Sequence, residues 1–216
     1  MSCQKGGLIM AAKYHSMKLF KIIKNFFFCL KYPFWRATNV WTGKYLGYSF
    51  TWYDDIPEGW QKAFGKQLSD EIKQVGEKYL KEHKGKKWKD ILYWQQIKEK
   101  YGELRLYASA IKEIMKVLEK YEMMSIGYCI NCGKPARYQT KGWLSFQCED
   151  CFTNFCKEYD YSDEEIEEAK KQCRLTKKDI PVLKTYHKGM NGKLISKKVN
   201  IKKKYGIDFK ELWDLK

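Results

Sequence analysis

Histidine, proline and catalytic signatures are scarce in this sequence. The 216 residues include three histidines and four prolines, and no Pro-rich or Gly/Ser-rich linker interrupts the chain. The H-E-x-x-H, G-x-S-x-G, P-loop and G-x-G-x-x-G motifs are all missing, and each of them marks a familiar catalytic or nucleotide-binding site. We therefore expect a protein that is not an enzyme.

The chain also lacks a run of about 18 apolar residues, the length that a transmembrane helix needs. The nearest candidate is the segment 17–34, where Lys21 and Lys24 interrupt the apolar residues and no small-residue cleavage site follows. This pattern argues against a membrane span and a secretory signal, and it predicts a cytoplasmic protein. It favours an amphipathic helix with one packed face made of Phe20, Ile23, Phe27 and Leu30.

Lysine and arginine outnumber aspartate and glutamate in this sequence, except in one segment. The sequence has 42 Lys and Arg against 26 Asp and Glu, which gives a net charge of +16. Residues 152–170 carry two positive and seven negative charges, whereas residues 171–216 carry 14 positive and four negative charges. A basic excess of this size is typical of proteins that bind nucleic acid, an anionic membrane or an acidic protein surface. The alternative is an acidic helix and a Lys-rich surface that are merely solvated.

Apolar periodicity and capping residues predict the elements in the first half of the chain. We expect one or two strands within residues 32–60, and then a helix that Asp55 caps and that ends near Leu80. Alternating apolar and charged residues around positions 101–102 indicate a β-hairpin. Ser109 is then placed to cap a second long helix.

The second half is predicted in the same way. Ser162 and Glu165 form a capping box that opens an acidic helix ending near Cys173. A further hairpin follows, with its turn at residues 189–192, and Asp208 is placed to cap a short last helix.

Together these elements predict an α+β fold. We expect two long helices packed on short antiparallel hairpins, with a four-cysteine zinc-ribbon or treble-clef-like module and a basic C-terminal extension. The predicted parts are a disordered leader (1–16), an α+β body (17–126) and the zinc module (127–158). An extension of acidic helix, basic hairpin and helix follows (159–216). Met10 and Met17 are alternative starts to Met1.

The strongest motif is two Cys-x-x-Cys pairs. The spacing C-x2-C-x15-C-x2-C is typical of a tetrahedral zinc site, and it is formed by Cys129, Cys132, Cys148 and Cys151. Two residues between thiolates let a tight turn aim both sulfurs at one ion, and Gly133 suits the left-handed backbone of such a knuckle. A small hairpin around Lys141 and Gly142 would bring the second pair back to the first.

This motif predicts a structural Zn2+ ion. Four thiolates close the coordination sphere, whereas a catalytic zinc keeps one position open for water. Another metal, disulfides or free thiols are the alternatives, and a reducing cytosol favours the metal over disulfides. A zinc-stapled nuclease would also need a second histidine near His187 and Asn191, and none follows there, so we disfavour that interpretation.

Three segments of the chain carry a family resemblance. A W-D-D-x-P-x-G-W pattern, with Tyr53 inserted, spans Trp52–Trp60, and an I-K-E-K-Y-G-x-L-R pattern spans Ile97–Arg105. The two Cys pairs flank Gly142 and Trp143. Over residues 17–152 these motifs resemble a group of small bacteriophage and prophage proteins of unassigned function. The resemblance implies a phage origin and a zinc-stapled α+β body, and residues 153–216 depart from it.

Two functions follow from these observations as hypotheses. The first is a non-enzymatic phage protein that docks on nucleic-acid-handling machinery in the bacterial host cytoplasm, for example as an inhibitor of a defence nuclease such as a CRISPR effector. The second is a zinc protein that binds DNA or RNA directly, as a phage transcription or replication regulator. In both, the candidate contacts to the partner or to phosphates are Lys177, Lys178, Lys184, Lys188, Lys193, Lys197, Lys198, Lys202, Lys203 and Lys204.

Overall fold

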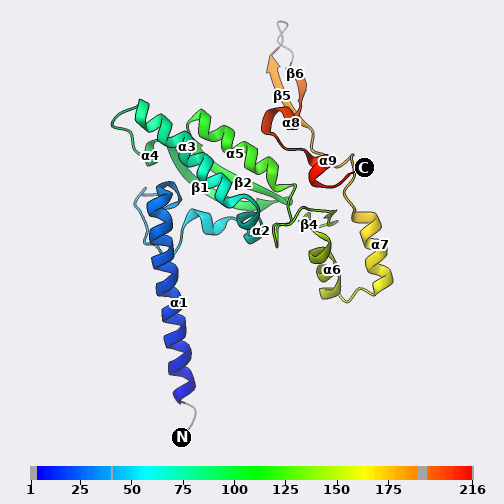
Figure 1. Ribbon diagram of the computed structural model, residues 1–216, viewed down its shortest axis with the longest axis horizontal. Helices are drawn as coiled ribbons and strands as arrows, with labels where there is room; N and C mark the ends of the chain where they lie inside the picture. The colour runs from blue at the N-terminus through cyan, green and yellow to red at the C-terminus, as the bar shows by residue number, and fades with distance from the viewer. Residues whose placement is uncertain (1–3, 40, 189–193, 216) are drawn as a thin grey trace. The chain divides into compact units, whose positions relative to one another are not determined.

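The computed structural model describes residues 4–39, 41–188 and 194–215, and for residues 4–17, 183–188 and 194–197 it describes the backbone alone. Helices alternate with short antiparallel hairpins along the chain (Figure 1). Within the described residues the strands form three two-stranded sheets, β1–β2, β3–β4 and β5–β6. The predicted α+β class is therefore confirmed.

The chain folds into two compact units, each assembled from separate stretches of sequence. The first consists of Met1–Pro57, Lys66–Lys98 and Arg105–Leu118. The second consists of Glu58–Gly65, Glu99–Leu104 and Glu119–Lys216. This division differs from the predicted boundaries at residues 126 and 158, because segments from the middle of the predicted body belong to the second unit.

The first unit begins with the long helix α1, Gln4–Lys31. The sequence predicts a disordered leader over residues 1–16, but the backbone is helical from Gln4 onward. Leucine, methionine, alanine and lysine in this stretch all have good helix propensity, which explains the difference. Among the described residues, no helix is both long enough and apolar enough to cross a bilayer.

The chain after α1 forms turns rather than the predicted strands. Two short 3-10 helices, η1 (Pro33–Trp35) and η2 (Trp52–Asp55), flank a loop. Two isolated antiparallel bridges, Arg36 with Thr51 and Thr38 with Tyr45, close that loop. The chain reverses direction in this region, but two isolated bridges hold the reversal in place of paired strands.

The first long helix starts later than Asp55, the predicted cap. The hydroxyl of Thr51 and the carboxylate of Asp54 instead form a capping box around η2, with Thr51 N–H donating to Asp54 Oδ2 at 2.7 Å. The helix runs as α2 (Glu58–Trp60), a π-helical turn η3 (Gln61–Gly65) and α3 (Lys66–Glu82).

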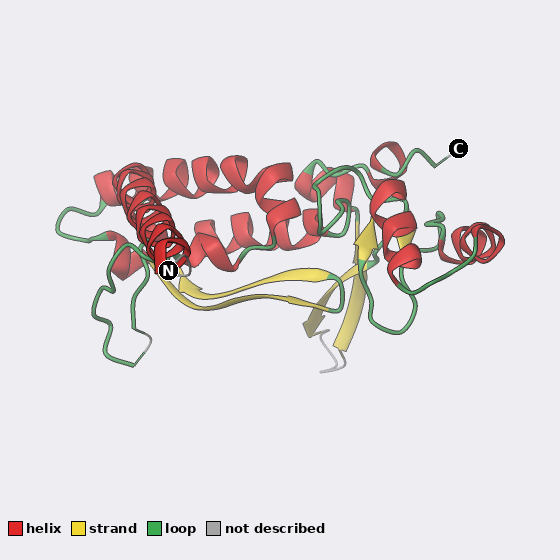
Figure 2. Cartoon of the chain, turned by 90° about the horizontal axis from the view of Figure 1, so that it is seen from below, coloured by secondary structure: helices red, strands yellow, loops and turns green. Residues whose placement is uncertain are grey.

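A long hairpin lies beside these helices. After the short helix α4 (Trp88–Ile91), strands β1 (Leu92–Lys100) and β2 (Glu103–Ala110) join at Tyr101 and Gly102, which both have positive φ, 59° and 76°. Such a pair fits a tight hairpin turn, as predicted. Helices α3 and α5 (Lys112–Ser125) cover one face of the hairpin (Figures 1 and 2).

Ser109 does not cap the second long helix, contrary to the prediction. It lies in β2, where its hydroxyl accepts a hydrogen bond from Gln95 Nε2 at 3.0 Å. Helix α5 starts three residues later, because strand pairing extends to Ala110 and takes precedence over the capping preference of serine.

Aromatic residues form the core of the first unit. The indole of Trp35 is fully buried and stacks on Trp94, with ring centroids 4.8 Å apart and an interplanar angle of 6°. Trp35 Nε1 donates to Ser69 Oγ at 2.9 Å, and Trp94 Nε1 donates to the Phe34 carbonyl at 2.9 Å. Both buried indole N–H groups are therefore satisfied, as burial of polar groups requires.

The second unit contains the cysteine segment and the C-terminal region. Its elements are β3 (Tyr138–Gln139), β4 (Phe146–Gln147), α6 (Glu149–Glu158), α7 (Asp163–Cys173), β5 (Leu183–Lys188), β6 (Leu194–Val199), α8 (Ile201–Tyr205) and α9 (Phe209–Leu212). The predicted capping box of Ser162 and Glu165 opens α7, and Asp208 caps α9. The hairpin β5–β6 is confirmed, while its turn at 189–192 lies outside the described residues.

The predicted extension shares its core with the cysteine segment. Ala136 and Phe146 pack in one cluster with Ile126, Leu175, Ile201, Ile207, Phe209 and Trp213. The guanidinium of Arg137 also donates to the Leu212 carbonyl at 2.9 Å. Residues after 158 are therefore packed onto the cysteine segment rather than appended to it as a separate part.

Candidate metal centre

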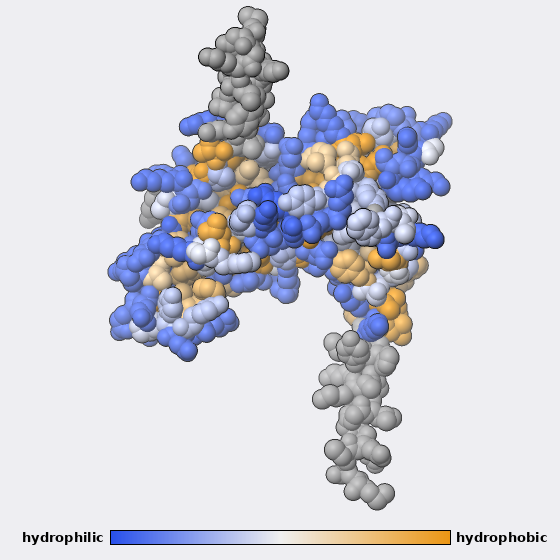
Figure 3. All heavy atoms as spheres, turned by 180° about the vertical axis from the view of Figure 1, so that it is seen from behind, coloured by the Kyte–Doolittle hydropathy of each residue, from blue (hydrophilic) through white to orange (hydrophobic). Residues whose placement is uncertain are grey.

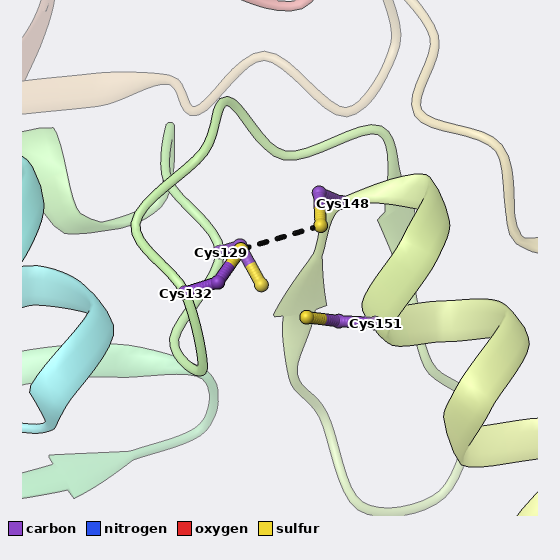
Figure 4. Close-up of side chains that lie close together, drawn as sticks. All are labelled: Cys129, Cys132, Cys148 and Cys151. Carbon is purple, nitrogen blue, oxygen red and sulfur yellow. Dashed lines mark hydrogen bonds between the residues drawn. The ribbon is translucent and has the colours of Figure 1, made fainter.

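The four predicted cysteine ligands converge on one point. The four Sγ atoms lie within 4.8 Å of one another, and Cys132 Sγ is 3.4 Å from Cys148 Sγ (Figure 4). Zn–S bonds of about 2.3 Å in a tetrahedron place the sulfurs about 3.8 Å apart. Cys129 and Cys148 are buried, whereas Cys132 and Cys151 are half-buried. The four thiols thus form a site that a single metal ion could occupy.

The first pair of cysteines lies on a tight backbone turn. The N–H of Gly133 donates to the Cys129 carbonyl at 2.9 Å, and the N–H of Cys129 donates to the Lys134 carbonyl at 2.8 Å. Gly133 has the predicted positive φ, 82°. The turn therefore points both sulfurs of this pair at the same side, toward the second pair (Figure 4).

The second pair of cysteines lies at the start of α6. Cys148 is the N-cap residue of this helix, and its carbonyl accepts a hydrogen bond from Phe152 N–H at 3.0 Å. Cys151 follows in the first turn of the helix. Strands β3 and β4 connect the two pairs, with Tyr138 opposite Gln147 and Gln139 opposite Phe146. The order along the chain is therefore turn, hairpin, and second pair opening a helix.

The π-helical turn η3 and the helix before it support the first cysteine turn. Gly59 N–H donates to the Ile130 carbonyl at 3.0 Å, and any side chain at Gly59 would collide with the carbonyls of Cys129 and Ile130. A side chain at Gly133 would come within 2.5 Å of the Gly59 carbonyl oxygen. This contact has no local signal in the sequence, because Gly59 and Gly133 lie far apart along the chain.

Gly133→Ala is expected to destabilise the metal centre. Alanine at φ 82° is strained, and its Cβ would meet the backbone of Gly59, so the turn must shift. We expect a loss of about 1–3 kcal/mol in the free energy of unfolding and weaker metal binding. Chemical denaturation and metal titration measure the two effects.

The control for Gly133→Ala is Gly43→Ala. Gly43 also has positive φ, 65°, but an added Cβ there meets nothing within 4 Å. This variant should show only the backbone strain and unchanged metal affinity. Equal metal affinity in Gly133→Ala and the parent chain would contradict the role that we give to the contact between Gly59 and Gly133.

The surroundings of the thiols balance burial against hydrogen bonding. Burial raises the pKa of the Cys132 thiol, but the backbone of Lys134 and the other three cysteines stabilise its thiolate, so that its pKa is lowered overall. Burial raises the pKa of Cys148 to about 11, and burial also raises the pKa of Cys151. Cys132 therefore ionises more readily than Cys148 and Cys151, and a bound cation would favour ionisation of these last two thiols.

Two lysines compensate negative charge at the edge of the site. Lys134 Nζ pairs with Asp150 Oδ2 at 2.7 Å, which links the first cysteine turn to helix α6. Lys62 Nζ pairs with Glu58 Oε1 at 2.7 Å, and this carboxylate and then Cys132 raise the pKa of Lys62. The pKa of Lys134 is raised by Asp150 and, more weakly, by Cys148 and Cys132. A Zn2+ ion held by four thiolates keeps a net negative charge, so these cations suit the site.

The remaining cysteines are outside this cluster. Cys156 is buried among Tyr138, Phe152 and Ile166, where burial raises its pKa, and it does not approach the four sulfurs as a fifth ligand. Every described cysteine is a free thiol. The disulfide alternative therefore does not describe this structure, while a bound metal and free thiols are both compatible with it.

The structure separates the predicted lysines into groups. Lys177 and Lys178 are exposed in the loop after α7, and Lys203 lies exposed on α8. Lys202 pairs with Asp208 at 2.6 Å and Lys204 with Glu119 at 3.3 Å. These last two cations are already neutralised within the chain, which makes them weaker candidates for phosphate binding than the sequence predicts.

The other candidate lysines belong to the hairpin β5–β6. Lys184 lies directly opposite Lys198, and Lys197 lies opposite Thr185. Lys188 lies opposite Leu194 at the end of the ladder, and Lys193 falls outside the described residues. His187 lies in β5 opposite Ile195, while Asn191, the other residue considered in the disfavoured nuclease interpretation, also falls outside the described residues.

Comparison with known proteins finds no significant match to this chain, whether by protein-family models, among curated proteins or among solved structures.

Proposed function

We propose that this chain is a non-enzymatic binding protein in which a structural Zn2+ ion holds a basic C-terminal region ready for an anionic partner. The observation that carries the proposal is the shared core of the second unit. Ala136 and Phe146, from the cysteine segment, pack with Ile201 and Trp213, from the basic region. A metal that fixes the first pair of residues thereby also fixes the second.

The chemistry of the four ligands supports a structural role for the metal. Four converging thiolates leave no open coordination position for water, and two of them are buried. The order of turn, hairpin and helix-opening pair favours the treble-clef-like module over a plain zinc ribbon, because α6 starts at Cys148. In such sites, metal binding supplies folding free energy.

The positive charges of the hairpin support an anionic partner. Lys184 and Lys198 are directly opposed across an antiparallel pair, an arrangement that is destabilising in the free protein. A partner that supplies negative charge would relieve this repulsion.

A second cationic surface lies in the same unit. An open hollow of about 740 Å³ is lined by Arg174, Lys177, Lys178, Asp214 and neighbouring residues. Among the described residues, no carboxylate forms an ion pair with Lys177 or Lys178. These two side chains therefore remain available to bind an external anion.

The acidic helix α7 favours a protein or nucleoprotein partner over bare nucleic acid. Its first turn holds Asp163, Glu164 and Glu165, followed by further glutamates, and it immediately precedes the cationic loop. The acidic part of such a surface repels a uniform polyanion, whereas the whole surface can match a partner that has both signs of charge. We therefore propose that the partner is nucleic-acid-handling machinery of a bacterial host.

The specific form of this proposal is inhibition of a defence nuclease such as a CRISPR effector. Its support is the resemblance to phage proteins together with the cationic region, which would occupy the nuclease surface that normally holds nucleic acid. Co-purification of the tagged chain with proteins of a bacterial host, followed by a cleavage assay on any captured nuclease, tests it. Failure to slow cleavage by a captured nuclease would contradict it.

Charge reversal in the loop after α7 is expected to abolish partner binding. The double variant Lys177→Glu and Lys178→Glu should reduce the captured partner at least about tenfold, because two charge-assisted contacts become repulsive. The measurement is quantitative mass spectrometry of proteins co-purified from host lysate. Point substitutions are preferable to truncation at 158, which would remove five of the eight buried residues of the shared core.

The matched control is the double variant Lys84→Glu and Lys86→Glu. These exposed lysines lie in the loop before α4, in the first unit, and their reversal changes the net charge by the same amount. This control should retain the partner. Equal losses in both double variants would show a nonspecific charge effect and contradict the proposed surface.

Direct binding of DNA or RNA is the second candidate, and the opposed lysines of β5–β6 favour it. Fluorescence anisotropy with duplex and single-stranded DNA, at about 50 mM and about 200 mM salt, distinguishes the two. A direct binder should lose affinity steeply with salt, because counterion release drives phosphate binding. Absence of binding at low salt would exclude the direct binder and leave the protein partner.

A further inference from the structure

Helix α1 exposes the apolar face that the sequence predicts to be packed. Phe20 is 71% exposed and Phe27 is 63% exposed, and the same exposed face includes Leu19, Ile23, Phe26 and Leu30. These positions recur at helical spacing and form one stripe. Figure 3 shows apolar surface on the described part of α1. The prediction that this face packs against the body is wrong.

The opposite face of α1 fixes the helix to the first unit. Asn25, Cys29 and Tyr32 are buried, at spacings of four and three residues. The hydroxyl of Tyr32 donates to Asp70 Oδ1 at 2.6 Å, and Asn25 Nδ2 donates to the Tyr48 carbonyl at 2.9 Å. The helix is therefore held by one face while six large apolar side chains on the other meet solvent. That exposure needs a partner surface to explain it.

The loop after α1 extends this apolar surface. Phe26 contacts the ring of Tyr48 edge-on at 5.2 Å, and the guanidinium of Arg36 lies 4.3 Å from the ring centroid of Tyr45. Trp41 is 92% exposed near the loop tip, where Asn39 Oδ1 accepts its backbone N–H at 2.9 Å. Exposed tryptophan and tyrosine beside cationic groups are typical of segments at a membrane–water interface.

The charge on α1 is of one sign. The helix Gln4–Lys31 contains six lysines and no aspartate or glutamate. Lys18, Lys24 and Lys31 are exposed within the described side chains. Lysine stems can lie along an apolar surface while their ammonium groups reach polar headgroups. This combination of a phenylalanine-rich face with lysines matches a helix that lies in an anionic lipid surface.

A second copy of the chain is a poorer occupant of this face. Two α1 helices packed along their apolar stripes would bring lysines from both copies together with no carboxylate on either helix. Like charges at close range oppose such pairing. An anionic lipid surface instead matches both the apolar stripe and the positive charge.

We propose that α1 and the loop around Trp41 bind the surface of an anionic bilayer, with the apolar stripe of α1 in the interface. The helix lies in the plane of the membrane and does not span it. The negative surface potential of such a leaflet attracts the lysines, and burial of the phenylalanines holds the helix there. This inference is independent of the metal centre and of the partner of the basic C-terminal region.

Vesicle sedimentation with the full-length chain tests the inference. Binding is expected to vesicles of phosphatidylcholine mixed with phosphatidylglycerol, and not to vesicles of phosphatidylcholine alone. The double variant Phe20→Ser and Phe27→Ser should lower the partition coefficient at least about tenfold, since two apolar side chains no longer enter the interface. Both residues are exposed, so the fold should survive, and circular dichroism checks this.

Trp143→Ser is the matched control. Trp143 is 82% exposed but lies in the second unit, so its removal should leave vesicle binding unchanged. Undiminished binding of the phenylalanine variant would show that net charge alone attracts the vesicles, and this would overturn the inference. A concentration-dependent dimer that the phenylalanine substitutions abolish, with no vesicle binding by the parent chain, would overturn it in favour of a second copy.

Discussion

Replacing Cys148 by serine should cost the second unit both its metal and its fold. Structural zinc sites contribute on the order of 10 kcal/mol of binding free energy, and a whole domain is stable by about 5–15 kcal/mol. Loss of one buried ligand from a group of four therefore removes most of the stability of this unit. We expect one zinc per chain in the parent protein, none in Cys148→Ser, and loss of cooperative unfolding in the variant.

The effect of metal loss should reach the C-terminal helices. Cys148 is flanked by the buried Gln147 and opens helix α6, while Phe146 stacks on Trp213 with centroids 6.3 Å apart. If the hairpin β3–β4 loses its anchor, that contact is lost as well. Fluorescence of the tryptophans and elemental analysis of the same samples should therefore change together.

Cys173→Ser is the control for the ligand variant. Cys173 is half-buried in the same unit but is not one of the four converging thiols. This variant should keep one zinc per chain and unfold near the temperature of the parent. A parent protein without zinc, or a Cys148→Ser variant with parental stability, would contradict the structural metal.

Trp35→Ala is expected to produce the second large effect. The side chain is 0% exposed, stacks on Trp94 and donates to Ser69 Oγ, so its removal leaves a cavity and eliminates this hydrogen bond. Replacing a buried tryptophan by alanine costs about 3–5 kcal/mol. Urea denaturation followed by circular dichroism should show this loss of stability in the first unit.

Trp41→Ala is the control for Trp35→Ala, because it also removes a tryptophan but one that lies outside the aromatic core. Trp41 is 92% exposed, and its replacement should change the free energy of unfolding by at most about 0.5 kcal/mol. Zinc content should remain at the parental level in both tryptophan variants, since the ligands belong to the other unit. Equal stability of Trp35→Ala and Trp41→Ala would contradict the aromatic core described here.

Local signals predicted several elements and the ligand set. The capping box of Ser162 and Glu165, the hairpin turn at Tyr101 and Gly102 and the left-handed Gly133 all depend on residues close in sequence, and each is present. The Cys pairs converge because a tight turn and a helix start each place two sulfurs together. Short-range geometry of this kind is visible in the residue order.

Contacts between residues distant in sequence overrode local preferences in the elements that were not predicted correctly. Asp55 and Ser109 have good capping chemistry, but a 3-10 turn and an extended strand occupy these positions. Periodicity identified an apolar stripe on α1 but could not show that the opposite face, with Asn25 and Cys29, is the one that packs. The side of an amphipathic helix that meets the body depends on surfaces that form elsewhere in the chain.

The sequence segments of the two units are interleaved, and this restricts how the chain can be cut into folded fragments. A fragment ending at Leu118 would contain every segment of the first unit, yet it would also carry Glu58–Gly65 and Glu99–Leu104 without the rest of the second. In that fragment the buried Trp60 would lose its hydrogen bond to the Tyr128 carbonyl, and the buried Phe64 would lose its ring contacts with Tyr121 and Tyr128. The backbone N–H of Leu104 would lose its acceptor, Ser125 Oγ. No single cleavage site yields two native halves, and a ribosome must release the chain through Trp213 before the core of the second unit can assemble.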